Sequence, residues 1–350
     1  MALLPQAGDV SRLMRTCRAL YTCHGVRILL SHGAKLHSPR QLKSFHDFSS
    51  KTNGYDHLRA LEIGIEALNN EKMKLMLVDV LRHARRLEKL KIHDPFLLAS
   101  DSRVSDAIAR LRNLKAFSSC SYSFEGADFN PSKMLTSMKS KLVKASIDFG
   151  NGEDPIDVLE NFASSLEELE VIGVVFKRKN IQYPKMKTLS VESWRVSEIG
   201  PLIHAYPNLR TLDIQGYLRA EHHHNHAAAC REMNKTFQLI ENSWKTLSYV
   251  HTTAIELYAL AINCKIHCLH VENICDHKDI VMLAAVLPDC RPSVLRIRSK
   301  DKRSFGKIAK IIPAADLIHL NLWIDLSGFS TSRRTDRNFE LVSLIFVLQQ

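Results

Sequence analysis

Residues 166–171 read LEELEV, residues 186–191 read MKTLSV and residues 209–214 read LRTLDI. Each hexamer has apolar residues at its first, fourth and sixth positions and polar residues between them. Because residues two apart lie on the same face of an extended chain, the fourth and sixth positions predict a short strand with one buried face. The residues that flank the fourth position are then expected on the opposite, solvent-facing side.

The same hexamer recurs along the chain, clearly in seven places and more weakly in four. Successive central residues lie from 20 residues apart, as between Leu169 and Leu189, to 35 apart, as between Leu212 and Leu247. Repetition at this period, with this strand pattern, is similar to that of leucine-rich repeats. The central residues of the copies are Leu61, Leu90, Leu114, Ala145, Leu169, Leu189, Leu212, Leu247, Leu269, Leu295 and Leu320.

Segments with helical periodicity separate these strands. One begins at Asp154, a capping residue followed by proline at the first helical position, and another begins at Asp276. A unit of one strand and one helix cannot cover its own apolar face, so the units are expected to stack. We therefore predict an α/β fold, an irregular leucine-rich-repeat solenoid of about ten or eleven strands. Its parallel strands form the concave side, its helices form the convex side, and a short helical cap precedes it.

The segment ahead of the first repeat has its own pattern. Residues 9–21 predict an amphipathic helix whose apolar stripe is Val10, Leu13, Met14, Cys17, Leu20 and Tyr21. Extended to residue 30, this stretch resembles the second half of an F-box, matched at Leu13, Met14, Cys17, Arg18, Leu20 and Tyr21. With the Ser-Phe-x-x-Phe element at residues 44–48, the chain is similar to divergent fungal F-box-like leucine-rich-repeat proteins, its F-box being truncated at the N-terminus. On the other interpretation, residues 9–30 only cap the first repeat.

The resemblance implies a function and partners. Proteins of this family act as substrate receptors of Skp-cullin-F-box ubiquitin ligases, so it implies a protein substrate, a Skp-type adaptor bound by the apolar stripe, and a cullin. Residues 1–50 are then a partial F-box-like helical cap with its linker, and residues 51–350 are the leucine-rich-repeat solenoid. The alternative is a leucine-rich-repeat binding scaffold that is not coupled to a ligase.

The solvent-facing strand positions predict a partner-binding concave wall. The charges along this wall are grouped. The early repeats are basic, the middle repeats are acidic, and the late repeats are basic and include a tryptophan. Such grouping sets partner choice, and the acidic middle opposes the nucleic-acid partner that a net charge of +11 would permit. The wall residues are Lys89, Lys91, Lys115, Lys144, Glu168, Glu170, Asp213, His270, Arg296, Arg298 and Trp323.

Motifs for catalysis, cofactors or metal are not found. The chain has no G-x-S-x-G, no Gly-rich phosphate loop, no H-E-x-x-H and no G-x-G-x-x-G. The absence of the last motif disfavours a doubly wound α/β fold. The histidine run at residues 222–226 predicts a solvated loop, because adjacent imidazoles rarely converge on one ion. Cys264, Cys268, Cys275 and His277 are expected to point in different directions. We therefore expect a non-enzyme without cofactor or metal.

Composition and the two chain ends complete these expectations. No apolar run is long enough for a signal peptide or a membrane span, and the eight cysteines are scattered. These features predict a soluble protein of the cytoplasm, the nucleus or both, with no membrane partner. Residues 338–350 are strongly apolar, and we expect them to form a helix packed against the last strand.

Overall fold

The computed structural model describes most of the chain after residue 24. The described residues are 25–65, 68, 70–94, 97–98, 101–119, 131–150, 152–177, 180–192, 198–216, 224–299, 305–311, 317–325 and 341–347. Within these ranges, none of the helices combines the length and the apolar character that crossing a lipid bilayer requires. Two compact units divide the chain: unit 1, Met1–Gly173, and unit 2, Val174–Gln350.

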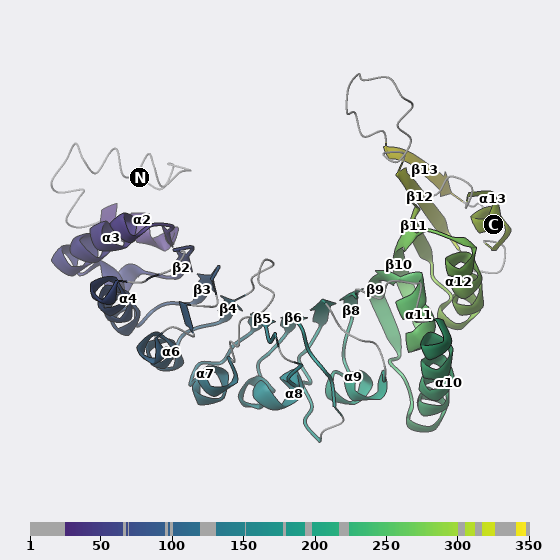
Figure 1. Cartoon of the computed structure of the whole chain (residues 1–350), viewed down its shortest axis with the longest axis horizontal. Helices are drawn as coiled ribbons and strands as arrows, with labels where there is room; N and C mark the ends of the chain where they lie inside the picture. The colour runs from purple at the N-terminus through teal and green to yellow at the C-terminus, as the bar shows by residue number, and fades with distance from the viewer. Residues whose placement is uncertain are drawn as a thin grey trace. The chain divides into compact units, whose positions relative to one another are not determined.

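Unit 1 alternates short parallel strands with helices. Each strand pairs in parallel with the next one along the chain, and the helices α3, α4, α6, α7 and α8 lie on one side of the strands (Figure 1). The strands are β1 (Ala34–Leu36), β2 (Ala60–Ile63), β3 (Lys89–Ile92), β4 (Ala116–Ser119), β5 (Lys144–Asp148) and β6 (Glu168–Ile172). The helices are α2 (Gly25–Ser31), α3 (Pro39–Thr52), α4 (Glu71–His83), α6 (Ser102–Ala109), α7 (Ser132–Ser137) and α8 (Pro155–Val158), with 3-10 turns η2 (Gly54–His57) and η3 (Glu160–Phe162).

Unit 2 repeats this construction with longer elements. Its strands are β7 (Thr188–Glu192), β8 (Thr211–Gln215), β9 (Thr246–Thr253), β10 (Lys265–Ile274), β11 (Val294–Ser299), β12 (His319–Asp325) and β13 (Leu341–Val347). Its helices are α9 (Gly200–Ala205), α10 (His224–Glu241), α11 (Ala254–Leu260), α12 (His277–Cys290) and α13 (Phe305–Ile311). Strands β7 to β12 run parallel in chain order, whereas β13 pairs antiparallel with β12.

The apolar positions of the hexamer build the core between strands and helices. Leu61, Leu90, Leu169, Leu212 and Leu269 are each at most 2% exposed. Each pairs across the sheet with the central residue of a neighbouring strand, as Leu61 does with Leu90. Burying one such side chain contributes about 1.5–3 kcal/mol, so the repeat pattern fixes both the strand register and the inward face.

Capping residues start the helices as the sequence predicts. Asp154 accepts a hydrogen bond from the Ile156 amide, and Asp276 forms a capping box with Asp279 ahead of α12. Ser38 likewise accepts from the Gln41 amide at the start of α3. Each cap satisfies amide groups that the first helical turn leaves without partners.

The predicted α/β alternation of parallel strands and helices is confirmed. The eleven predicted strands correspond to β2 to β12, and β1 is an additional strand within residues 1–50, where a purely helical cap was expected. Gly33, at φ 85°, makes the turn from α2 into β1. The backbone of β1 pairs with β2, so Ala34 lies opposite Leu61.

Two weak copies of the hexamer were placed in the wrong register. Phe117, rather than Leu114, pairs with Leu90 and Ala145. Likewise Val250, rather than Leu247, pairs with Leu212 and Leu269. Lys115, predicted as a wall residue, thus precedes β4 instead of lying beside its central position, and its ammonium group lies 2.9 Å from Glu88.

Two segments have secondary structure that the sequence analysis did not predict. Residues 341–347 form strand β13 instead of a helix, and their backbone pairs with the otherwise unpaired side of β12. An open strand edge favours this arrangement, because its amide and carbonyl groups need partners. The histidine run was expected in a solvated loop, yet residues 224–226 begin helix α10.

The helix side of unit 2 contains buried polar side chains. Asn234 on α10 accepts a hydrogen bond from the Ile199 amide and donates one to the Ala259 carbonyl. Arg231, only 4% exposed, lies 2.6 Å from Asp289 on α12 and over the Tyr258 ring on α11. These contacts tie α10 to α11 and α12 through groups that a purely apolar repeat would lack.

Candidate functional site

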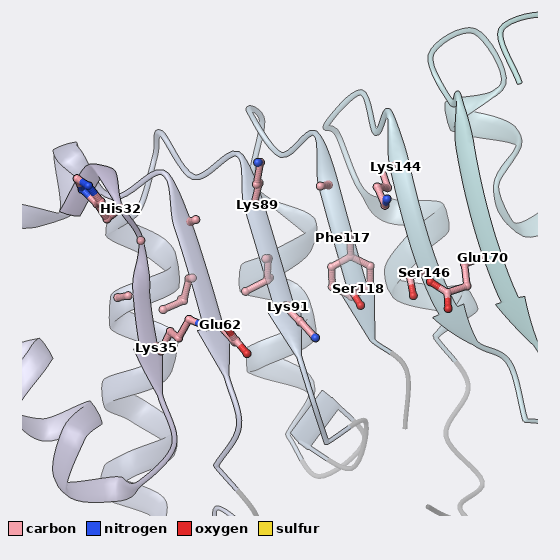
Figure 2. Close-up of a pocket in the computed structure, with 16 residues that line it drawn as sticks. His32, Lys35, Glu62, Lys89, Lys91, Phe117, Ser118, Lys144, Ser146 and Glu170 are labelled. Carbon is pink, nitrogen blue, oxygen red and sulfur yellow. Dashed lines mark ion pairs between the residues drawn. The ribbon is translucent and has the colours of Figure 1, made fainter. Parts of the chain in front are cut away.

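The side of the unit 1 strands away from the helices is here called the open face of unit 1. The outward side chains of β1 to β6 form it, and residues of all six strands line a hollow of about 310 Å³ on this face (Figure 2). Small residues, among them Ala60, Ala116, Ser118 and Ser146, occupy outward positions in this hollow. Because their side chains project little, the hollow is a groove that crosses several strands. The charged residues that line it are Lys35, Glu62, Lys89, Lys91, Lys144 and Glu170.

Several charges of this groove are paired within the protein. Glu62 lies 2.8 Å from His93 and 2.9 Å from Lys35. The hydrogen bond from His93, then that from Lys35, lowers the pKa of Glu62 to about 2. Lys144 on β5 lies 2.6 Å from Glu168 on β6. These ion pairs join neighbouring strands.

Lys89 and Lys91 on β3 differ from these lysines. Both are exposed, and among the described residues neither has an ion-pair partner. They stand two positions apart on the same strand, in the part of the groove between Glu62 and Ser118 (Figure 2). Two ammonium groups are therefore available there to an anionic ligand.

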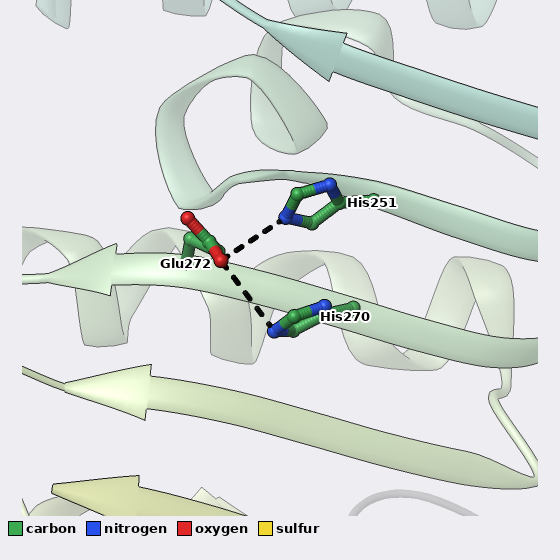
Figure 3. Close-up of side chains that lie close together, drawn as sticks. All are labelled: His251, His270 and Glu272. Carbon is green, nitrogen blue, oxygen red and sulfur yellow. Dashed lines mark ion pairs between the residues drawn. The ribbon is translucent and has the colours of Figure 1, made fainter. Parts of the chain in front are cut away.

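A second cluster lies on the open face of unit 2, defined here by the outward residues Asp213, Tyr249, His251, His270, Glu272, Arg296, Arg298 and Trp323. Strand register places His251 on β9 directly opposite His270 on β10, and their rings stack with centroids 4.5 Å apart. Glu272, two residues further along β10, points toward both rings (Figure 3). Its Oε1 lies 3.4 Å from His251 Nε2 and 3.9 Å from His270 Nε2.

Each imidazole is also held on its far side. His251 Nδ1 lies 3.0 Å from Asp213 Oδ1 on β8, and His270 Nδ1 hydrogen-bonds to the Tyr249 hydroxyl at 3.2 Å. The ring of Trp323 on β12 meets His270 edge to face at 5.3 Å. Both Nδ1 atoms are thus engaged, which leaves the two Nε2 atoms facing Glu272.

The two histidines differ in proton affinity. The hydrogen bond to Asp213 raises the pKa of His251 above its ordinary value. Burial, together with the neighbouring His251, lowers the pKa of His270. The pair therefore favours a state in which His251 holds a proton and His270 is neutral, since two stacked imidazolium rings would repel each other.

The predicted wall residues are divided between these two places. Lys89, Lys91, Lys144 and Glu170 line the groove of unit 1, and Glu168 pairs with Lys144 beside it. Asp213, His270, Arg296, Arg298 and Trp323 lie on the open face of unit 2, where Arg298 approaches Glu272 to 3.9 Å. The predicted adaptor-binding residues, Val10, Leu13, Met14, Cys17, Leu20 and Tyr21, lie outside the described residues.

Sequence reasoning missed His251, Glu272 and Tyr249. With Leu247 as the central residue of β9, the flanking residues are Thr246 and Ser248, so the predicted register left Tyr249 and His251 off the wall. The correct signal was Leu247-x-x-Val250, with Tyr249 and His251 flanking Val250. By contrast, Cys264 is buried and Cys275 is exposed. In the described part of the chain, the cysteines with His277 do not converge into a possible metal-binding group.

Comparison with known proteins adds no relative. No protein-family model matches this sequence, and no curated protein matches it. The fold defines an α/β protein whose parallel strands follow one another in chain order, and the two open faces are its candidate sites.

Proposed function

We propose that the chain is a leucine-rich-repeat-type recognition protein that binds an acidic, extended segment of a protein partner in the groove of unit 1. The observation that carries this proposal is the pair of exposed lysines, Lys89 and Lys91, in a groove with small side chains along it. Recognition rather than catalysis suits a surface of this kind, because exposed lysines and small residues supply attraction and access without an activated nucleophile.

The shape of the groove supports an extended ligand. Neighbouring strands lie about 4.8 Å apart, and an extended chain crossing them would meet one strand after another. Ala60, Ala116 and Ser118 leave room for its backbone close to the sheet. Carboxylates on such a chain could then reach Lys89 and Lys91 without first breaking an internal ion pair.

Binding of a fluorescent peptide of eight glutamates tests this proposal by anisotropy. Reversing both charges, Lys89→Glu with Lys91→Glu, is expected to weaken binding at least about tenfold, or about 1.4 kcal/mol. The matched control is Lys133→Glu with Lys139→Glu, two exposed lysines in and just after α7, outside the groove lining. It has the same net charge and should bind within about twofold of wild type, because exposed charges far from a site are screened.

Two outcomes would overturn the groove as the binding site. The first is equal weakening in both double variants, which would mean a response to net charge alone. The second is the absence of saturable binding by wild type at micromolar peptide. Circular dichroism of every variant separates either result from a folding defect, since exposed lysine substitutions cost little stability.

The resemblance of residues 9–30 to an F-box supports a more specific role, that of a substrate receptor of a Skp-cullin-F-box ubiquitin ligase. The open face of unit 1 would then hold the substrate, and the apolar stripe around Leu13 and Met14 would bind the adaptor. Purified Skp-type adaptor should bind the wild-type chain and not Leu13→Asp, with thermal stability measured on both. A wild-type chain that binds the acidic peptide but no adaptor would favour the scaffold without ligase coupling.

A further inference from the structure

We propose that His251, His270 and Glu272 form a binding site for a divalent transition-metal ion, Zn²⁺ in particular. The three ligand atoms, one from each side chain, all lie within 4.8 Å of one another. They come from two adjacent strands, so the sheet register brings them together (Figure 3). The site is separate from the groove of unit 1 and does not depend on what binds there.

The distances fit a zinc ion with little adjustment. Zinc binds imidazole nitrogen at about 2.0–2.1 Å and carboxylate oxygen at about 2.0–2.2 Å, so ligand atoms around a tetrahedral ion lie about 3.4 Å apart. Glu272 Oε1 is already 3.4 Å from His251 Nε2 and is 3.9 Å from His270 Nε2. Rotation of the side chains would bring the three ligand atoms, which lie within 4.8 Å of one another, to these separations.

The groups behind the two histidines have the arrangement that metal sites use. A ligating histidine usually donates its other ring N–H to a carboxylate or a comparable acceptor, which fixes the ring and its tautomer. Asp213 accepts from His251 Nδ1, and the Tyr249 oxygen is the partner of His270 Nδ1. With a proton on each Nδ1, His270 Nε2 presents a lone pair toward Glu272, and His251 Nε2 presents one once zinc has displaced the second proton of that ring.

One atom of the cluster lacks a partner of its own. His270 Nε2 is buried and has no hydrogen bond within the described part of the chain. Leaving a buried polar atom without a partner is costly, so this nitrogen calls for a ligand. A metal ion between Nε2 and Glu272 would satisfy it.

Two arginines on β11 set a limit on the affinity. Arg298 Nη1 lies 3.9 Å from Glu272 Oε1. The charge of Arg296 is among the groups that lower the pKa of His270, after burial and His251. The charged groups that face the site are therefore two carboxylates, Asp213 and Glu272, and two guanidinium groups, Arg296 and Arg298. The arginines oppose a doubly charged ion, and removing one should tighten its binding. Three protein ligands leave one tetrahedral position for water or for a donor from a bound molecule.

Calorimetric titration of the chelator-treated full chain with ZnCl₂ tests the proposal. All variants also carry His222→Ala, His223→Ala, His224→Ala and His226→Ala, so that the histidine run cannot contribute a second zinc site. This parent protein is expected to bind one Zn²⁺ with a dissociation constant in the micromolar range or tighter. His270→Ala and Glu272→Gln should weaken it at least about tenfold, and Asp213→Ala about 10- to 100-fold, because His251 loses its orienting partner.

Two further variants separate a metal site from a structural cluster. His267→Ala removes an exposed histidine of the same strand that belongs to no metal-binding group among the described residues, and it should leave zinc affinity unchanged. Arg298→Gln should tighten zinc binding several-fold, an effect that a merely structural role would not produce. Melting curves without metal identify any variant that fails to fold.

The absence of saturable zinc binding in the parent protein would overturn the proposal. So would equal losses in His270→Ala and His267→Ala, because the zinc would then be bound elsewhere. A parent protein that binds zinc but fails to bind the glutamate peptide would leave this inference standing while removing the proposed function of the groove.

Discussion

The two units use one strand pattern but place their polar groups differently. In unit 1, charged residues pair at exposed strand positions, as Lys144 does with Glu168 at 58% and 48% side-chain exposure. In unit 2, polar groups are buried or half-buried, as in the Arg231–Asp289 pair, whose arginine side chain is 5% exposed. The hexamer fixes the core in both units, so the remaining positions are free to differ.

Burial decides what each kind of polar contact can do. An exposed ion pair is screened by water and contributes only about 0.2–1 kcal/mol, so the lysines of unit 1 can exchange partners for a ligand at little cost. A buried polar group must keep its partner, because losing that partner costs several times more. Unit 1 therefore suits reversible recognition, whereas the histidine cluster of unit 2 is already oriented by its neighbours.

The largest expected effect tests the register of β4. Phe117 is 1% exposed at the central position, so Phe117→Ala should lower the free energy of unfolding by about 3–5 kcal/mol. Lys115→Ala should cost less than about 1 kcal/mol, because it removes an exposed ion pair. Urea denaturation of both variants measures the difference, and equal losses would contradict the register.

The next effect concerns the ion pair of unit 2 between the buried Arg231 and the half-buried Asp289. Asp289→Asn should destabilise the protein by about 3 kcal/mol, because it leaves the buried Arg231 guanidinium without its counter-charge. Lys144→Ala, which breaks an exposed pair of unit 1, is the control and should cost about 0.2–1 kcal/mol. If the two variants lose the same stability, burial does not make the ion pair of unit 2 more important for folding than the exposed pair of unit 1.

A smaller effect is expected from a neutral buried group. Asn234→Ala removes the acceptor of the Ile199 amide and the donor to the Ala259 carbonyl. Each buried group left without a partner costs about 1–3 kcal/mol. Faster hydrogen exchange at the Ile199 amide would localise the loss, whereas Thr236→Ala, an exposed residue two positions along α10, should leave that amide protected.

The sequence predicts the core and most of the strand order because apolar burial repeats at a readable period. It fails where a buried position is polar. Ser119 and Thr252 occupy the third apolar position of β4 and β9 at 0% and 1% exposure, so the pattern there matched a hexamer three residues earlier. Thr252 can be buried because its hydroxyl donates to Glu256, a contact that no periodicity reveals.

The residues of the candidate sites were predicted where the strand register was correct and missed where it was not. Lys89, Lys91 and Lys144 were predicted because β3 and β5 have clear or correctly placed hexamers. His251 was missed because β9 was displaced, and Glu272 because β10 continues beyond its hexamer to Ile274. Convergence of side chains from two strands depends on register, and a register error of three residues moves a different set of side chains onto the open face.

The smallest expected effect is the pH dependence of stability that comes from Glu62, the carboxylate of an ion-pair cluster in unit 1. The pKa of Glu62 is lowered to about 2 by His93 and then Lys35. A carboxylate whose pKa is lower in the folded state stabilises the protein above its unfolded pKa of about 4.3. That contribution is lost as the pH falls from there through about 2. It should stay below about 1 kcal/mol, because the side chains of Lys35 and His93 are 71% and 41% exposed and water screens the pair.

Glu62→Gln isolates this contribution. At pH 7 the variant should be slightly less stable than wild type, and the difference should shrink as the pH falls from about 5 toward 2, because the wild-type carboxylate is then protonated too. Urea midpoints at each pH measure it. Glu160→Gln, an exposed glutamate of η3, should show no such convergence. A Glu62→Gln difference that stayed constant or grew in acid would mean that the carboxylate of Glu62 is not held by His93 and Lys35 in solution.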